Sequence, residues 1–242
     1  MAYPLPGRSF NFHSRFMAQP EFMNRLTAEN IFVSAGQKEI LKGVAISAAQ
    51  GKITGLLGLN GSGKSTLLRT IFGTQKSDDQ NIQVKGRSIR SAYKVGGLLN
   101  FLPSHSMLPG NLEIKTILAH YGIMAGQIVN SVPELEDDLE KHVFELAGGH
   151  ERLWSALLLI YADTLFTMLD EPFTHLGPVY IERLKEILRT EKERKGIIIT
   201  DHMHRHLLEV SDDLFLMKEG KTIYCRNSDD LVVHGYLSKR LM

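Results

Sequence analysis

Hydrophobic residues in the first half of this chain fall in runs with two different periods. Ile53–Leu57 is an apolar run between Gly51 and Gly58, and it predicts a buried strand. The next segment, Ser65–Phe72, places its leucine, isoleucine and phenylalanine at helical spacing ahead of Gly73, which can cap a helix end. This pattern predicts a strand, a glycine-rich loop and a helix.

The same alternation of patterns returns in the second half of the chain. Helices are predicted at Glu151–Tyr161 and Val179–Arg194, and strands at Leu165–Leu169 and Gly196–Thr200. Strands that alternate with helices are typical of a parallel sheet covered by helices. We therefore expect an α/β fold with a mainly parallel sheet.

Two other regions have patterns of their own. Between Leu26 and Gly58, short apolar runs broken by glycines predict a small N-terminal antiparallel β-subdomain. Residues 105–148 are expected to form an inserted helical subdomain, helical over 111–145, in which the acidic stretch Glu134–Glu140 is a solvated face.

The beginning of the chain differs in composition from the rest. Residues 1–22 interleave prolines and charges with aromatic residues and lack the apolar block of a secretory signal. We expect them to be a non-native or disordered N-terminal extension. One domain is expected over residues 23–242.

The composition is typical of a folded, water-soluble protein. Of the 242 residues, 43% are hydrophobic and 23% are charged, and the net charge is +1, so the charge favours no direct nucleic-acid partner. Cys225 is the single cysteine, which excludes an internal disulfide and suits a reducing compartment. The longest apolar run, Ala156–Ala162, is far below the roughly 20 residues that span a bilayer. We expect a cytoplasmic protein.

The loop between the predicted strand and helix matches the phosphate-loop pattern G-x-x-x-x-G-K-S/T. Its glycines let backbone N–H groups point at phosphate oxygens, and the helix N-terminus adds about half a positive charge. We expect Lys64 to reach the β and γ phosphates and Ser65 to bind Mg²⁺. The alternative is a glycine-rich turn with a surface lysine. The expected nucleotide-binding residues are Gly58, Leu59, Asn60, Gly61, Ser62, Gly63, Lys64, Ser65 and Thr66.

Two carboxylates end the predicted strand Leu165–Leu169. Asp170 is expected to hold Mg²⁺, and Glu171 is expected to polarise a water molecule as a general base. A pair of charges at a helix N-terminus is the alternative explanation, and the phosphate loop favours the metal and base roles.

His202 follows the last predicted strand, at the edge of the sheet where α/β proteins bind ligands, and could contact a γ-phosphate. A metal site of His202, His204 and His206 is disfavoured, because residues two apart share a face only on a strand and this segment looks helical. His204 and His206 are expected at the surface.

A third motif, Leu146-Ala147-Gly148-Gly149-His150, lies upstream of the carboxylate pair and resembles the L-S-G-G-Q signature of the ATP-binding cassette (ABC) family. With the phosphate loop and the carboxylates, it makes residues 26–225 similar to the nucleotide-binding domain of that family, which has a P-loop NTPase core. The chain has no N-K-x-D motif of the kind that GTPases use to recognise their base.

This resemblance implies roles for the quoted residues. Gly58–Ser65 would be the Walker A loop, in which Lys64 is catalytic, Asp170 the Walker B carboxylate, Glu171 the catalytic base and His202 the switch histidine. Family members form head-to-tail dimers in which the signature faces the partner's ATP. The residues implied to face the partner subunit are Ala147, Gly148, Gly149 and His150.

Four positions depart from the family pattern. Ala147 stands for the signature serine and Ser104 for a glutamine that senses magnesium; Gly177 stands for an aspartate and Ala35 for an aromatic that stacks on adenine. Phe32 could replace the missing aromatic, but a place in the core is favoured because phenylalanine is usually buried.

The resemblance implies a stand-alone ATP-hydrolysing subunit of an ABC transporter, with ATP and Mg²⁺ as cofactors. Its implied partners are a second ABC subunit, in a homodimer or heterodimer, and an integral membrane transporter subunit. The chain itself would be cytoplasmic and peripheral on the cytoplasmic face of the membrane. One alternative is a degenerate regulatory half with weak hydrolysis. The other is a soluble ABC ATPase that does not take part in transport.

Overall fold

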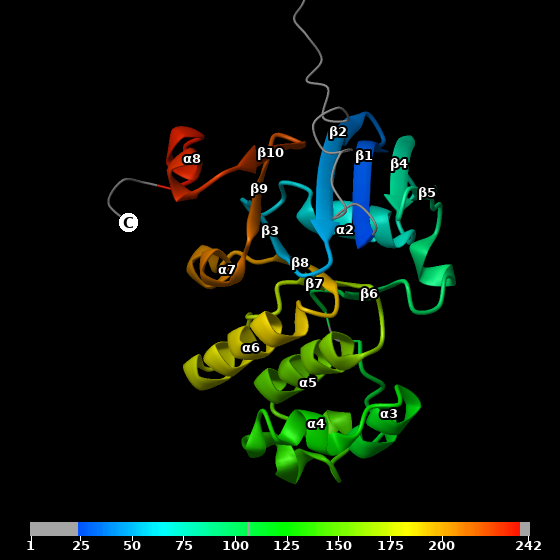
Figure 1. Cartoon of the computed structure of the whole chain (residues 1–242), viewed down its shortest axis with the longest axis vertical. Helices are drawn as coiled ribbons and strands as arrows, with labels where there is room; N and C mark the ends of the chain where they lie inside the picture. Colours follow the sequence, from blue (N-terminus) through cyan, green and yellow to red (C-terminus); the bar gives the residue numbers. More distant parts are fainter. Residues whose placement is uncertain (1–23, 106, 238–242) are drawn as a thin grey trace, which may run out of the picture.

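The structure of this protein is a computed structural model that describes residues 24–105 and 107–237. The expected extension, residues 1–22, lies outside the described residues. Two sheets and a set of surrounding helices make up the described part (Figure 1). The predicted α/β class, with a mainly parallel sheet, an antiparallel N-terminal sheet and an inserted group of helices, is confirmed.

The first sheet is antiparallel and has the strand order β2-β1-β4-β5. Its long pair, β1 and β2, is the antiparallel subdomain that the glycine-broken runs predict. The two short strands come from a segment to which the sequence pattern assigned no structure. The bounds are β1 Arg25–Ala35, β2 Lys38–Ala49, β4 Asp79–Val84 and β5 Arg87–Ser88.

The second sheet has the order β10-β9-β3-β8-β7-β6. Its strands run parallel except for β10, which pairs antiparallel with β9. Strands β3, β8 and β7 are adjacent, so their carboxyl ends meet at one edge of the sheet. The bounds are β3 Ile53–Gly58, β6 Leu99–Leu102, β7 Phe166–Asp170, β8 Gly196–Thr200, β9 Asp213–Lys218 and β10 Lys221–Cys225.

Alternate residues of the central strands pack into two separate hydrophobic cores, one on each face of the sheet. Leu56 and Met168 face the core shared with the antiparallel sheet and α2, whereas Leu57 and Leu169 face the core shared with α5, α6 and α7. Helices α5 and α6 lie side by side on that second face (Figure 1). The helix bounds are α2 Lys64–Phe72, α5 Gly148–Tyr161, α6 Pro178–Glu191, α7 His204–Val210 and α8 Ser228–Val233.

The helical insertion lies beyond α5, on the side away from the antiparallel sheet (Figure 1). The expectation of helix over 111–145 is wrong in detail, because the segment is a series of short helices. Gly122, with φ of 66°, follows the first, and Pro133 begins the third. The pieces, together with the short helix before β6, are α3 Ile114–His120, α4 Ala125–Val129 and the 3₁₀ turns Ala92–Lys94, Pro133–Asp138 and Val143–Glu145.

The structure corrects several sequence predictions, two about the burial of side chains and two about the ends of helices. Phe32 is 39% exposed rather than buried, because β1 lies at the molecular surface and Phe32 packs over Gly43, whose missing side chain leaves room for the ring. Asp138 is 1% exposed, so the acidic stretch is not wholly solvated. Helix α5 begins at Gly148 rather than Glu151, and α6 ends at Glu191 rather than Arg194.

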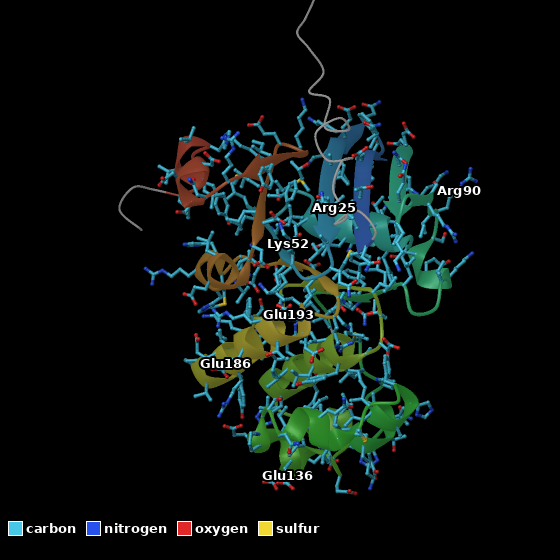
Figure 2. The ribbon with its side chains drawn as sticks, viewed as in Figure 1. Arg25, Lys52, Arg90, Glu136, Glu186 and Glu193 are labelled. Atoms are coloured by element: carbon cyan, nitrogen blue, oxygen red, sulfur yellow. The ribbon has the colours of Figure 1, made fainter. Side chains whose placement is uncertain are left out.

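Most charged side chains lie on the outside of the molecule. Figure 2 shows Glu136 at the far end of the insertion and Glu186 and Glu193 on and after α6, all of them exposed. Over the described ranges, every helix is too short or too polar to cross a bilayer.

Candidate functional site

The glycine-rich loop runs from the carboxyl end of β3 to the start of α2. Gly63 has φ of 109°, a conformation that favours glycine, and an added Cβ would lie 2.8 Å from Leu41 Cδ2. Gly61 is also left-handed, with φ of 77°. The glycines therefore allow the tight curl that aims backbone N–H groups into the concave side of the loop.

Lys64, the first residue of α2, is 5% exposed. Its ammonium donates hydrogen bonds to the carbonyls of Gly58 at 2.8 Å and Leu59 at 3.2 Å. Burial lowers the pKa of Lys64, and the negative charges of Glu171, Asp170 and Asp201 oppose that shift. The ammonium therefore lies within the field of carboxylates that come from two other strand ends.

A cavity of about 610 Å³ opens beside the loop, a volume usual for small-molecule sites. Three hydroxyl residues, Ser62, Ser65 and Thr66, belong to its lining, so a ligand with polar atoms fits this loop. The residues fit a triphosphate with its cation, because they combine N–H donors, an ammonium, hydroxyls and a carboxylate. The lining residues are Lys38, Glu39, Ile40, Lys42, Asn60, Gly61, Ser62, Gly63, Lys64, Ser65, Thr66, Glu171, Glu219 and Gly220.

Two of the predicted loop residues lie outside this lining. Gly58 and Leu59 instead provide the carbonyls that hold Lys64, and Leu59 is 74% exposed. The polar rim formed by β2 and by Glu219 and Gly220 was missed by sequence reasoning. It forms because the β9–β10 turn returns to β2, where the Lys42 N–H donates to the Gly220 carbonyl at 2.8 Å.

The carboxylate pair lies at the end of β7. Asp170 is 1% exposed, and its Oδ1 accepts a hydrogen bond from Thr200 Oγ1 at 2.5 Å. Glu171 has φ of 58°, and its N–H donates to the Thr200 carbonyl at 2.8 Å. The next strand, β8, thus holds both residues, and Glu171 reaches the cavity wall.

His202 lies next to Glu171 at the same edge of the sheet. Its Nδ1 is 3.7 Å from Glu171 Oε2 and 3.6 Å from Asp201 Oδ1. Asp201 is fully buried and accepts hydrogen bonds from the N–H groups of Phe173 and Met203. Burial raises the pKa of Asp201 against those bonds. The carboxylate therefore ties the loop after β7 to the loop after β8.

The signature-like residues open helix α5, away from the cavity lining. Ala147 is the N-cap of this helix. An added Cβ on Gly149 would lie 2.8 Å from the His175 carbonyl oxygen, so the helix start packs against the loop after β7 only because this residue is glycine.

His150 links three elements. Its Nδ1 lies 2.6 Å from Asp138 Oδ2 and its Nε2 lies 2.9 Å from the Tyr180 hydroxyl. Asp138 also accepts hydrogen bonds from Lys141 and Trp154. Sequence reasoning missed Asp138, although it lies three residues after buried Leu135, at helical spacing on the same face.

The other departures lie at the edges of this region. Ser104 and Ala35 are exposed, and Gly177 is the N-cap of α6, the helix that begins with Pro178. Neither Ala35 nor Phe32 is among the residues that line the cavity, so in this structure its walls near β2 are lysine, glutamate and isoleucine.

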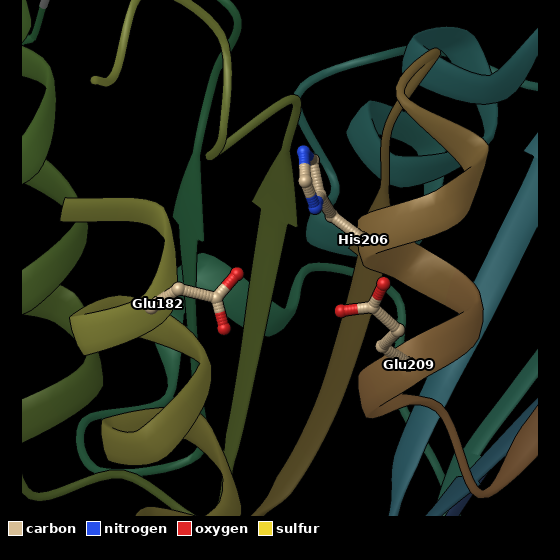
Figure 3. A group of neighbouring side chains, drawn as sticks. All are labelled: Glu182, His206 and Glu209. Carbon is tan, nitrogen blue, oxygen red and sulfur yellow. The ribbon is translucent and has the colours of Figure 1, made fainter. Parts of the chain in front are cut away.

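A different group from the three histidines brings metal-capable atoms together. Glu182 of α6 and His206 and Glu209 of α7 point toward one another, with ligand atoms within 4.8 Å (Figure 3). The ammonium of Lys185, whose side chain is 1% exposed, forms ion pairs with both carboxylates. The single Lys185 ammonium therefore balances one of the two carboxylate charges and occupies an oxygen of each. His206 is partly buried rather than at the surface, as is His204.

Comparison with known proteins identifies the family. Residues 41–174, more than half of the chain, match the family model for the ABC transporter. The chain belongs to this family. The ABC relatives include the lantibiotic transport ATP-binding protein SrtF of Streptococcus pyogenes, which is 29% identical over 84% of this chain and 91% of its own. They also include the lipopolysaccharide export system ATP-binding protein LptB of Haemophilus influenzae, which is 27% identical over 83% of this chain and 90% of its own.

Solved structures agree with the ABC fold. A nucleotide-free ATP-binding cassette from an ABC transporter superposes with a TM-score of 0.75 at 22% identity, covering 90% of this chain and 100% of that one. The ATP-binding subunit of another ABC transporter gives a TM-score of 0.75 at 20% identity, over 87% and 93% of the two chains. The family match and these folds identify an ABC nucleotide-binding subunit.

The Asp138 network generates a stability prediction for this ABC subunit. Burial alone would raise the pKa of Asp138, but the hydrogen bonds from Lys141, His150 and Trp154 outweigh it and lower the pKa. Asp138→Asn should reduce the free energy of unfolding by about 1–3 kcal/mol at pH 7, because Lys141, His150 and Trp154 lose the charged carboxylate that accepts their hydrogen bonds. Urea denaturation measures this loss.

The sign of the pH dependence follows from the lowered pKa of Asp138. Its stabilisation is present above the unfolded-state pKa and is lost as the pH falls through the folded-state pKa. The difference in the free energy of unfolding between wild type and Asp138→Asn should therefore become smaller as the pH is lowered toward 3. Asp137→Asn, an exposed neighbour, is the control and should match wild type. Equal stability of Asp138→Asn and wild type at pH 7 would contradict this account of the network.

Proposed function

We propose that this chain binds and hydrolyses MgATP as the ATP-binding subunit of an ABC transporter. The observation that carries the proposal is that Lys64 and Glu171, from different strand ends, line one cavity beside the phosphate loop. A cationic loop rich in N–H donors holds phosphates, and a carboxylate on the facing wall can accept a proton from water. Together they supply what hydrolysis of a phosphoanhydride requires.

Each proposed site residue has a distinct task. The N–H groups of loop 58–65 and the Lys64 ammonium would bind the β and γ phosphates. Ser65 and Asp170 would hold magnesium, which when bound neutralises charge on the phosphate oxygens. Glu171 would take a proton from the attacking water, whose oxygen ends in inorganic phosphate as ADP leaves. His202, 3.7 Å from that carboxylate, would contact the γ-phosphate.

The proposed active unit is a head-to-tail dimer with a second ABC subunit. Helix α5 begins with Gly148 and Gly149, whose N–H groups can bind an anion, yet these residues lie outside the lining of their own cavity. The apolar side chains of Leu59 and Val179 are 74% and 60% exposed, as expected of a surface that a partner covers. A second subunit would bring a signature to each nucleotide.

The proposed membrane partner would dock on the helical insertion. Tyr121, Met124 and Phe144 are 44%, 72% and 71% exposed there. Apolar side chains on one small subdomain favour a protein partner over solvent. The chain would then be peripheral on the cytoplasmic face of the membrane. Its relatives SrtF and LptB are named for different cargoes, so the cargo is left to the membrane subunit.

The degenerate-half alternative rests on the departures Ala35, Ser104, Ala147 and Gly177. Each of them removes a group from the edges of the site, whereas Lys64, Asp170, Glu171 and His202 keep the groups that hydrolysis needs. This balance favours an active ATPase.

Glu171→Gln should lower ATP turnover about 10²- to 10⁴-fold while the affinity for ATP is retained, because glutamine cannot take a proton from water. Steady-state phosphate release and equilibrium binding of a fluorescent ATP analogue measure the two effects. Turnover of wild type equal to that of Glu171→Gln would favour the degenerate half.

Lys64→Ala should weaken ATP binding about 10- to 100-fold, because a charge-assisted contact to the phosphates is removed. Isothermal titration with an ATP analogue measures the affinity. Lys76→Ala, at an exposed lysine after α2, is the matched control and should bind as wild type. Unchanged affinity in Lys64→Ala would remove the loop from the nucleotide site.

The transport role is tested by co-purification from detergent-solubilised membranes of the native source. We expect an integral membrane subunit to accompany the wild type, and Met124→Asp with Phe144→Asp to lose it, because charge is placed on the proposed contact. Val233→Asp, at a residue 79% exposed on α8, is the control and should retain it. Recovery with ribosomes or DNA alone would support the non-transport alternative.

A further inference from the structure

Arg152 carries a buried charge for which sequence reasoning found no role. It lies on α5, one turn after Gly148, and the residue is only 8% exposed. A buried guanidinium needs acceptors for its N–H groups, since burying an unpaired charge is strongly unfavourable. The acceptors that it uses therefore indicate what it does.

The Arg152 guanidinium donates hydrogen bonds to backbone carbonyls at the ends of two strands, β6 and β7. Nη1 donates to the carbonyl of Pro103, just after β6, at 2.7 Å. Nη2 donates to the carbonyls of Asp170 and Glu171, at the end of β7, the latter at 3.1 Å. A planar fork with donors in fixed directions suits this bridging, and a lysine ammonium does not reproduce it.

The backbone at Glu171 needs such support. Its φ of 58° is left-handed, a conformation that is unfavourable for a residue with a side chain. Conformations of this kind persist only where surrounding contacts hold them. The N–H of Glu171 is held by the Thr200 carbonyl at 2.8 Å, and its carbonyl is held by Arg152. Both sides of the strained residue are thereby anchored, from β8 and from α5.

We propose that Arg152 is a positioning residue for Glu171: it fixes the left-handed backbone that aims the Glu171 carboxylate into the cavity. The inference rests on the proposed role of Glu171 as the base. Because Arg152 shares a helix with Gly148 and Gly149, it also joins the signature mechanically to the carboxylate of the same subunit.

Kinetics of full-length variants test this inference. Arg152→Met should lower kcat about 10- to 100-fold with KM for ATP within about twofold of wild type, since a displacement of about 1 Å can cost a factor of 10². The kcat of Arg152→Lys should lie between those of wild type and Arg152→Met, because lysine keeps the positive charge but not the planar fork of donors. Arg194→Met is the matched control, since Arg194 also donates to two carbonyls, those of Ile160 and Ala162, far from the cavity.

A double variant separates positioning from general damage. In the Glu171→Gln background the base is already absent, so adding Arg152→Met should reduce the residual turnover less than twofold. A loss as large as that in the wild-type background would overturn the proposal, because it would mean that Arg152 acts on something other than Glu171.

A readout without nucleotide tests the same point independently of activity. Hydrogen–deuterium exchange should be faster in Arg152→Met over residues 170–176 and unchanged in β2, whereas Arg194→Met should leave residues 170–176 as in wild type. The proposal would be overturned if Arg152→Met exchanged faster throughout the protein, or if its exchange over residues 170–176 were as slow as in wild type. Absence of ATP turnover in the wild type would instead count against the proposed function and leave the exchange result as the test of Arg152.

Discussion

The charge balance around Lys64 is the constraint on which the site depends. A buried ammonium is stable only with acceptors and opposite charges nearby, and here the acceptors are the carbonyls of Gly58 and Leu59. The carboxylates of Asp170, Glu171 and Asp201 supply the opposing charge from the ends of two neighbouring strands. The parallel order of β3, β8 and β7 brings these groups together, and so the sheet topology determines the electrostatics of the cavity.

The elements around this charge cluster hold it from several directions. Thr200 on β8 bonds to Asp170 and to the Glu171 N–H, and Asp201 ties the two loops that follow β7 and β8. Helix α5 contributes Arg152 from the face opposite α2. The site is therefore supported by side chains that are themselves buried, which limits the freedom of the carboxylate pair.

Much of the fold could be predicted from the sequence because its strongest signals are local. Short apolar runs predicted β3, β7 and β8 to within a residue, and the phosphate loop followed from its pattern. The missed features depend on partners distant in the chain. Lys185 and Lys195 lie among other charged residues in the sequence, yet both are buried. The contacts that bury them come from Glu209 and from carbonyls at the end of α5, which no local pattern reveals.

The central claim is that a triphosphate with its cation binds between the phosphate loop and the carboxylate pair. A crystal structure with magnesium and a non-hydrolysable ATP analogue tests it most directly. The account predicts the γ-phosphate against Lys64, with Ser65 and Asp170 around the metal and Glu171 facing the phosphorus. An analogue bound elsewhere, or a cavity that stays without nucleotide at saturating concentration, would contradict it.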